Sequence, residues 1–479
     1  MGNPIFIVSK KVVCIAVLII IFELEKSCSN FFFLEIYFSP KSFINFCLKP
    51  QLSIKGPCLK KNKICVIGLG YVGLPLAIKL SKFYDLVGYD HDKKRILELK
   101  NKVDITNEIK ISEIKRSGIL FTHDKYDIKD CNIYIITVPT PVDSKKKPLL
   151  TSLINVTKTI SLFLKDQDLI IYESTIYPGC TDEILIPTLE SLSKKKVNKN
   201  FYVGYSPERI NPGITKYKLT NQSKVISGSN KKVASVIKKI YGKIIKKKLF
   251  IADSIKVAEA AKMIENTQRD INIAFINEIS VLFHKLNINT TDVLNAAATK
   301  WNFLNFKPGL VGGHCVGVDP YYLKFKAQNV GLNPHMISSG RKVNDSIPKF
   351  IVKEIFKLLK LKKKKLKNNK ILLLGITFKE NCNDFRNSQA ITLFKLLKKN
   401  QKIDVYDNLA NKKDLFNLHK INLTNKIKKK NFYDIIIVCV PHEKIKRFKI
   451  NFLKSIGNKK LIIIDIKSIY PKKSVEWQL

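Results

Sequence analysis

The sequence predicts an α/β protein in which two doubly wound domains are joined by a long central helix. Apolar strand segments alternate with helical stretches twice, once before residue 250 and again after residue 370. Between the two series lies a stretch over 253–288 that contains no proline or glycine. The chain of 479 residues is also too long for one ordinary domain.

The chain carries a formal net charge of +46, supplied by 78 Lys and only seven Arg. Proteins that bind nucleic acid usually use Arg for bidentate contacts, so this composition favours a surface coated with Lys by biased codon usage. Wherever Arg persists against such a bias, we expect its guanidinium geometry to be needed. The positions of interest are Arg95, Arg209, Arg269, Arg341 and Arg386.

The cysteines and the first sixty residues indicate which kinds of site and which location to expect. The ten cysteines are scattered without Cys-x-x-Cys pairs, which predicts no metal site, no disulfide framework and a cytoplasmic location. The segment "KKVVCIAVLIIIF" (10–22) is too short to span a bilayer, and no small-residue cleavage site follows it. We expect no stable association with a membrane, and we treat residues 1–60 as an atypical extension outside the fold.

A dinucleotide site is predicted where the first strand meets the first helix. In "KICVIGLGYVGLPLAIKL" (63–80) Gly68, Gly70 and Gly73 follow an apolar strand, and the next strand ends at Asp90. Such glycines permit a tight turn and close approach of a diphosphate to the helix N-terminus, which is typical of a Rossmann-like domain. An acid in the position of Asp90 accepts from the adenosine ribose and favours NAD over NADP. Arg95 is a counter-signal, because a nearby arginine can hold a 2′-phosphate.

Three further strands of the first series end in polar residues. Thr140 follows the strand within 131–141, Glu173 ends the strand within 168–179, and Glu208-Arg209 follow the strand within 200–213. Ligands bind at the carboxyl ends of the strands in open α/β sheets, so these residues predict a lined cleft.

The helix predicted over 253–288 presents polar groups in an apolar setting. Lys262, Asn266 and Arg269 are spaced i, i+4 and i+7 and therefore share one face. A solvated charged stripe is the alternative, but Asn and Arg are not what the compositional bias would supply. A lysine partly withdrawn from water can act as an acid or base near neutral pH. The length of the helix also suits a dimer spine.

The stretch "PGLVGGHCVGVDPYYL" (308–323) places Cys315 in a loop with little side-chain bulk around it. A thiol that must meet a substrate needs such clearance, whereas a buried structural cysteine does not. Further on, 357–370 is rich in lysine and is expected to be a solvated linker. The first loop of the second strand series offers Lys379 and Arg386, a pattern typical of an anion site.

From about residue 62 onward the chain resembles the UDP-glucose/GDP-mannose dehydrogenase family, and within it the Vi-polysaccharide-type branch that oxidises UDP-N-acetylglucosamine. The resemblance rests on "VIGLGYVGLPLA", "YIITVPTPVD", "YVGYSPERINPG", "SIKVAEAAKMIENTQRD", "KWNFLNFKPGLVGGHCVGVDPYYL" and "GITFKENCNDFRN". It implies an NAD-binding Rossmann domain over 61–250, a central helical dimerisation domain with the Cys315 loop over 251–356, and a C-terminal UDP-sugar-binding domain over 357–479.

The family chemistry takes the C6 alcohol of a sugar to a carboxylate with two NAD reductions, through a thiohemiacetal and a thioester on a cysteine. Matching motif to motif, Cys315 is that thiol, Asp319 orients water, and Lys262 with Asn266 stabilises the oxyanion or acts as acid or base. The resemblance also implies that Thr140 and Glu208 belong to the catalytic set, near the cofactor and the reacting carbon. The resemblance implies two sets of binding residues. Those toward the cofactor are Gly68, Gly70, Tyr71, Val72, Gly73, Asp90, Arg95, Thr140, Glu173 and Arg386. Those toward the UDP-sugar are Glu208, Arg209, Ile210, Lys262, Asn266, Arg269, Gly309, Phe378 and Lys379.

One departure bears on the substrate. UDP-glucose dehydrogenases carry a second glutamate four residues after the one matching Glu208, and here that position is Pro212. This form favours UDP-N-acetylglucosamine or its C4 epimer, on a route to surface polysaccharide such as capsule. The same chemistry on UDP-glucose or UDP-N-acetylmannosamine stays open. So does a basic nucleic-acid- or membrane-binding protein on an inactive dehydrogenase fold, although intact Cys315 and Asp319 count against it.

Overall fold

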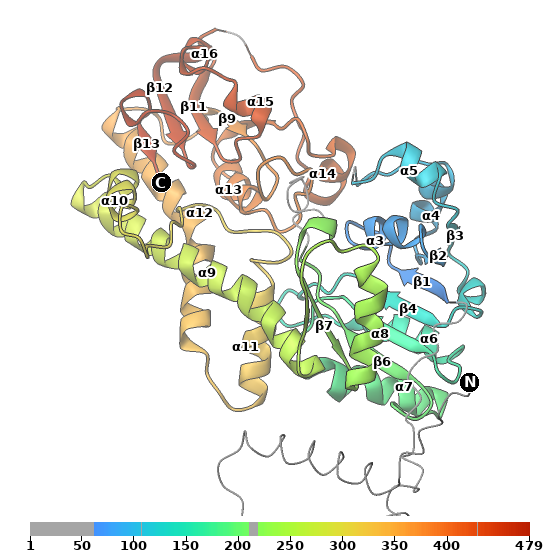
Figure 1. The fold of residues 1–479 in the computed structure, drawn as a ribbon. Coiled ribbons are helices and arrows are strands. Elements are labelled where there is room, and N and C mark those ends of the chain that lie inside the picture. The colour runs from blue at the N-terminus through green and yellow to red at the C-terminus, as the bar shows by residue number, and fades with distance from the viewer. Residues whose placement is uncertain (1–61, 107, 210–218, 429) are drawn as a thin grey trace, which may run out of the picture. The chain divides into compact units, whose positions relative to one another are not determined.

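We describe the fold from a computed structural model, which covers residues 62–106, 108–209, 219–428 and 430–479 (Figure 1). The extension over 1–60, the expected substrate contact Ile210 and the diagnostic Pro212 lie outside the described residues.

The first sheet is built from the strand series predicted before residue 250. Its strands are β1 (Lys63–Ile67), β2 (Asp85–Tyr89), β3 (Leu120–Thr122), β4 (Ile133–Ile136), β5 (Leu169–Tyr172), β6 (Tyr202–Tyr205), β7 (Lys224–Gly228) and β8 (Leu249–Ile251). They lie in the order β3-β2-β1-β4-β5-β6-β7-β8, and the pairing is parallel except between β6 and β7. The first six strands thus have the doubly wound order typical of dinucleotide-binding domains.

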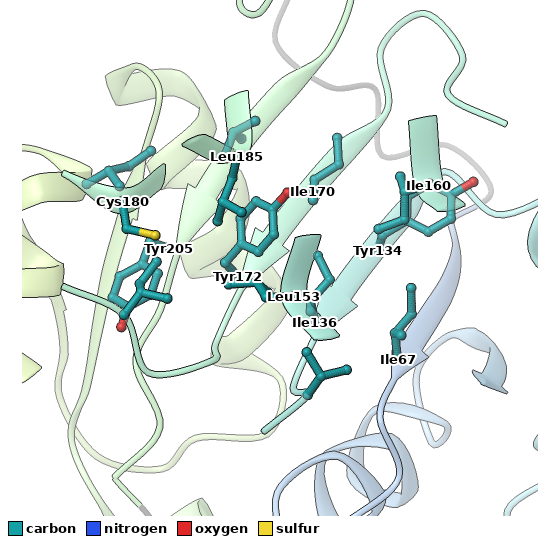
Figure 2. Close-up of a cluster of buried hydrophobic side chains, with 14 of the residues drawn as sticks. Ile67, Tyr134, Ile136, Leu153, Ile160, Ile170, Tyr172, Cys180, Leu185 and Tyr205 are labelled. Atoms are coloured by element: carbon teal, nitrogen blue, oxygen red, sulfur yellow. The ribbon is translucent and has the colours of Figure 1, made fainter. Parts of the chain in front are cut away.

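Helices cover both faces of this sheet because alternate strand residues point to opposite sides. The helices of this part are α3 (Gly73–Leu80), α4 (Lys93–Lys100), α5 (Ile111–Lys115), α6 (Thr151–Ser161), α7 (Ile186–Ser193) and α8 (Lys231–Gly242). Helices α3, α4 and α8 pack on one face. On the other face Leu153 of α6 and Leu185 meet Ile136, Tyr172 and Tyr205 of the sheet (Figure 2).

The middle of the chain is helical, with α9 (Ile255–Leu286), α10 (Thr290–Ala297), α11 (Asp319–Asn329) and α12 (His335–Leu361). The prediction of one long helix is confirmed by α9, which begins after Ser254, whose hydroxyl accepts from the Val257 N–H at 3.2 Å. It ends at Asn287 in a left-handed conformation. Figure 1 shows α9 as the longest ribbon.

The linker prediction over 357–370 is wrong for its first five residues, which form the end of α12. Ile347, Ile351, Ile355 and Leu359 recur every four residues and are fully buried against the second sheet. The lysines around them are exposed, so the start of the charge run is one face of a helix, and residues 362–369 connect α12 to β9.

The second sheet contains β9 (Lys370–Leu374), β10 (Lys402–Tyr406), β11 (Tyr433–Val438), β12 (Gly457–Asp465) and β13 (Trp477–Gln478). Its order is β10-β9-β11-β12-β13, and every pair is parallel. Its helices are α13 (Gln389–Lys398), α14 (Lys412–His419), α15 (Glu443–Lys446) and α16 (Ile450–Ile456). Helices α12 and α13 pack on one face, and α15 and α16 pack on the other. This is the second doubly wound sheet that the sequence predicts.

Within the described residues, no helix combines the length and apolar character required to cross a lipid bilayer.

Candidate active site

One cavity of about 2000 Å³ gathers nearly all of the predicted site residues. Its walls come from the turn after β1, the carboxyl ends of β4 and β5, one side of α9, the Cys315 loop and the loop after β9. The predicted residues that line it are Gly68, Gly70, Tyr71, Val72, Asp90, Arg95, Thr140, Glu173, Glu208, Arg209, Lys262, Asn266, Arg269, Gly309, Cys315, Phe378, Lys379 and Arg386. Gly73 and Asp319 lie behind the wall, in contact with residues that do line it.

The cofactor end is shaped by the glycine turn. Gly68 has a φ of +91°, and a Cβ at Gly73 would lie 1.8 Å from the Gly68 carbonyl oxygen, so both positions require glycine. A Cβ at Gly70 would meet nothing within 4 Å, which leaves room for a ligand over the backbone. Helix α3 has no side-chain cap at its N-terminus, and Asp90 follows β2 with Oδ2 accepting from the Leu69 N–H at 2.8 Å. These residues fit a dinucleotide diphosphate and ribose.

Arg95 is engaged by the protein itself. Its Nε donates to the Leu69 carbonyl at 2.9 Å and its Nη2 donates to Asp104 at 2.8 Å. Burial would raise the pKa of Asp104, but hydrogen bonds from Arg95 and Thr106 outweigh it and hold that pKa below its usual value. Arg95 therefore hydrogen-bonds the glycine turn and Asp104 instead of offering its guanidinium to a 2′-phosphate. This arrangement supports NAD over NADP as the cofactor.

The Cys315 thiol opens onto the cavity. Among the six cysteines of the described residues, Cys315 alone is exposed. Desolvation by the cavity walls raises the pKa of Cys315, and the nearby Lys262 ammonium acts in the opposite direction. A cysteine held this way matches a nucleophile better than a packing residue.

Lys262, Asn266 and Asp319 form the group around the thiol. The Lys262 Nζ donates to the Glu208 carbonyl at 2.9 Å, and the Asn266 Nδ2 donates to Asp319 Oδ2 at 2.6 Å. Burial raises the pKa of Asp319 to about 6. Its Oδ1 has no hydrogen-bond partner among the described residues, so it offers an acceptor for water.

Burial and the acidic groups around Lys262 act on its pKa in opposite directions. Burial alone would lower its pKa, but the acidic groups Cys315, Asp319 and Glu208 act in the opposite direction, and the net effect is a raised pKa. A lysine with a raised pKa is protonated at neutral pH, which favours a fixed positive charge over a base at this position.

The substrate end is held by contacts between segments distant in sequence. Arg209 pairs with Glu265 of α9, while Arg269 is exposed toward the cavity. Phe378 packs so closely on the Cys315 loop that a Cβ at Gly313 would lie 2.6 Å from its ring. Burial lowers the pKa of Lys379 beside it.

Arg386 joins the two ends of the cavity. Its Nη2 donates to Asp384 at 2.8 Å, and its guanidinium lies 5.6 Å from the centre of the Tyr71 ring. Asp384 also pairs with His314 at 2.9 Å, which ties the catalytic loop to the second sheet domain.

Sequence reasoning missed Glu265, Lys224, His314 with Asp384, and Lys467, all of which lie at or beside the cavity. Lys224 and Lys467 could not be singled out from the sequence, because the chain contains 78 lysines. Glu265 could have been found, since it lies one helical turn from Lys262 on the face already singled out.

Sequence profiles of one family match three consecutive parts of the chain. They describe an NAD binding domain over residues 62–245, a central domain over 256–346 and a UDP binding domain over 372–472. The chain belongs to the UDP-glucose/GDP-mannose dehydrogenase family. It is therefore an NAD-dependent nucleotide-sugar dehydrogenase, as the cofactor end of the cavity indicates.

This dehydrogenase is similar to curated relatives over most of its length. It is 46% identical to the UDP-N-acetyl-D-glucosamine 6-dehydrogenase of Salmonella typhi, covering 87% of this chain and 98% of that protein. It is 42% identical to the enzyme of the same name from Pseudomonas aeruginosa, covering 88% and 100%. Among solved structures, the UDP-D-ManNAc dehydrogenase of Pyrococcus horikoshii has a TM-score of 0.78 at 30% identity, covering 87% of this chain and 98% of that one.

Proposed function

We propose that this dehydrogenase oxidises the C6 alcohol of UDP-N-acetylglucosamine to the carboxylate in two NAD-dependent steps. The observation that carries the proposal is the exposed Cys315 thiol in the same cavity as the glycine turn, with Lys262 and Asp319 beside it. A single alcohol oxidation would need no nucleophilic thiol, whereas oxidation to the acid without release of the aldehyde does.

The glycine turn with Gly68 and Gly70, and Asp90 after β2, would hold NAD, which would supply a hydride acceptor for C6 in each of the two oxidations. The Lys262 ammonium, fixed by the Glu208 carbonyl, stabilises the negative charge on the C6 oxygen. Cys315 Sγ adds to the aldehyde carbon to give a thiohemiacetal, and the second oxidation leaves a thioester on that sulfur. Asp319 Oδ1 orients the water that cleaves the thioester, so the carboxylate product leaves and the thiol is restored.

The choice of sugar rests on the relatives and on one motif. The relatives at 46% and 42% identity are both named for UDP-N-acetyl-D-glucosamine. Pro212 stands where UDP-glucose dehydrogenases have a glutamate, as the motif comparison indicated. Arg209, Arg269, Gly309, Phe378 and Lys379 would hold the nucleotide sugar. The product is an anionic sugar nucleotide of the kind that surface polysaccharides incorporate, made by a homodimer in the cytoplasm.

The test is NADH release by the full chain offered UDP-N-acetylglucosamine, UDP-N-acetylgalactosamine and UDP-glucose in turn, with Cys315→Ser as control. We expect two NADH per N-acetylhexosamine, because each alcohol passes through two oxidations, and loss of net turnover in the variant. Turnover with UDP-glucose alone would move the assignment to that substrate. Absence of NADH with every nucleotide sugar would refute the proposed function.

A further inference from the structure

Lys224 is a buried lysine behind the active site that the chemistry above does not use. It begins β7, and its side chain is 4% exposed. A buried ammonium is costly unless it is paired and its hydrogen-bonding capacity is met. Its partners therefore indicate what holds it there.

The Lys224 ammonium contacts four groups. It donates to Glu173 Oε2 at 2.9 Å and to the carbonyl oxygens of Ser206 and Pro207 at 3.3 Å each. It also lies 3.7 Å from Glu208 Oε2. The two carbonyls belong to consecutive residues of the turn after β6, so one charge fixes the turn that carries Glu208.

Glu173 and Tyr241 complete the buried cluster. The Tyr241 hydroxyl donates to the other oxygen of Glu173, and the Lys224 Nζ lies 4.8 Å from the centre of the Tyr241 ring. Burial raises the pKa of Glu173 to about 7, while Lys224 acts to lower it. Lys224 belongs to β7, Tyr241 to α8, and Glu173 follows directly after β5.

The cluster reaches the reacting centre through one residue. Glu208 meets Lys224 with its side chain and accepts from the Lys262 ammonium with its backbone carbonyl at 2.9 Å. Lys262 in turn is the positive charge beside Cys315. Lys224 can therefore influence the thiol without touching substrate or cofactor.

We propose that Lys224 is a positioning residue, which locks the Ser206–Glu208 turn so that the Glu208 carbonyl holds the Lys262 ammonium against Cys315 and the C6 oxygen. This proposal rests on the proposed function for its kinetic consequences, but the arrangement of Lys262 and Cys315 can be measured without turnover. Small displacements of a charge that stabilises a transition state cost rate more than binding.

The central variant is Lys224→Met, which keeps the length of the side chain and removes its charge. Because it leaves Glu173 buried without its cation, the double variant Lys224→Met/Glu173→Gln is made beside it to relieve that cost. The matched control is Lys364→Met, which removes another buried lysine, one that pairs with Asp434 at 3.1 Å in the second sheet domain. Lys262→Met serves as the reference for full loss of the active-site charge.

Two readouts separate positioning from stability. The first is kcat and KM with UDP-N-acetylglucosamine and NAD, at a temperature where every variant is folded. The second is the rate of alkylation of Cys315 by iodoacetamide across a pH series, followed by mass spectrometry of the peptide. We expect Lys224→Met to lose roughly tenfold or more in kcat with little change in either KM, and the double variant to lose as much kcat with little change in the KM for the nucleotide sugar. The alkylation midpoint of Cys315 should rise toward that of Lys262→Met.

The opposite results would overturn the proposal. It is wrong if Lys224→Met lowers only the melting temperature, as Lys364→Met is expected to do, or if the double variant recovers wild-type kcat and alkylation. If the wild-type chain oxidises no nucleotide sugar, the proposed function fails by itself. The Cys315 alkylation profile of the variants then still decides whether Lys224 positions Lys262.

Discussion

At the scale of the residue, the scarcity of arginine marks the positions where a guanidinium is used. Arg95 braces the glycine turn, Arg209 pairs with Glu265, and Arg386 pairs with Asp384. The sequence could raise these positions because seven Arg stand out against 78 Lys. The sequence could not predict that Arg95 pairs with Asp104 instead of a phosphate group. That pairing depends on the path of the chain after α4, which brings Asp104 next to Arg95.

Asp319 is predicted to set the last chemical step. In Asp319→Asn, water near the thioester loses its carboxylate, so we expect a burst of NADH followed by a stall, with steady turnover lower by roughly a hundredfold or more. Intact-mass analysis should find the sugar nucleotide attached to Cys315. A variant that turns over slowly without any covalent adduct would place the role of Asp319 before the thioester.

The same residue is predicted to cost stability. Burial raises the pKa of Asp319 from 3.8 to about 6, so its cost to stability is absent below pH 3.8, grows as the pH rises, and is fully present once the pH is above about 6. At neutral pH this cost is on the order of 3 kcal/mol. Asp319→Asn should therefore unfold at higher denaturant concentration than wild type at neutral pH, with a smaller difference near pH 4. Equal midpoints at both pH values would contradict this.

At the scale of the element, α9 and α12 are joined by a buried charge cluster. Asp270 of α9 accepts from Arg341 Nη1 at 2.5 Å and from Asn344 Nδ2 at 2.7 Å. Arg341 was singled out from the sequence, and its guanidinium serves this pair of helices rather than a ligand. The cluster holds α9, and with it Lys262 and Asn266, against the rest of the helical middle.

We predict that Arg341→Met lowers the free energy of unfolding by about 3–5 kcal/mol, because Asp270 is left buried without its cation. Urea denaturation followed by circular dichroism measures this. The double variant Arg341→Met/Asp270→Asn should recover a large part of the loss. If the single and double variants are equally unstable, packing by the arginine stem rather than charge pairing stabilises the helix pair.

The elements differ in how far the sequence specified them. Helix α9 could be predicted because no proline or glycine interrupts it and Ser254 caps it. Helix α12 contains Gly340 and Pro348, residues that ordinarily interrupt a helical pattern. Its last turn also overlaps a lysine-rich stretch, which obscures the apolar periodicity. Burial of Leu359 against the second sheet stabilises that turn, and such tertiary packing is not visible in local sequence.

At the scale of the whole molecule, the cavity joins segments that the sequence placed separately. Most residues that line the cavity could be predicted from the motifs and from the polar residues at strand ends. This works because ligands bind at the carboxyl ends of parallel strands. The contacts between the segments were not predictable. His314 meets Asp384, and Tyr71 donates to Asn383 at 3.1 Å, across 70 and 312 positions of the chain.

The Tyr71 contacts predict that the two ligands bind cooperatively. Tyr71 belongs to the NAD-binding turn, yet it touches Asn383 and lies under Arg386, both in the loop after β9 beside Phe378 and Lys379. A nucleotide sugar that orders this loop should therefore also order the turn, and the reverse must hold to the same extent. We expect isothermal titration calorimetry to show NAD binding about threefold tighter in the presence of UDP, a coupling of about 0.7 kcal/mol.

The variant Tyr71→Ala should remove this coupling, because it deletes both the hydrogen bond to Asn383 and the ring beneath Arg386. NAD affinity in the absence of UDP should fall less, since the diphosphate site is made by backbone of the glycine turn. Tyr71→Phe is the matched control, because it keeps the ring and loses only the hydroxyl. If Tyr71→Ala retains the full coupling, the two sheets communicate through α9 or the Cys315 loop instead, and the contact at Tyr71 is incidental to binding.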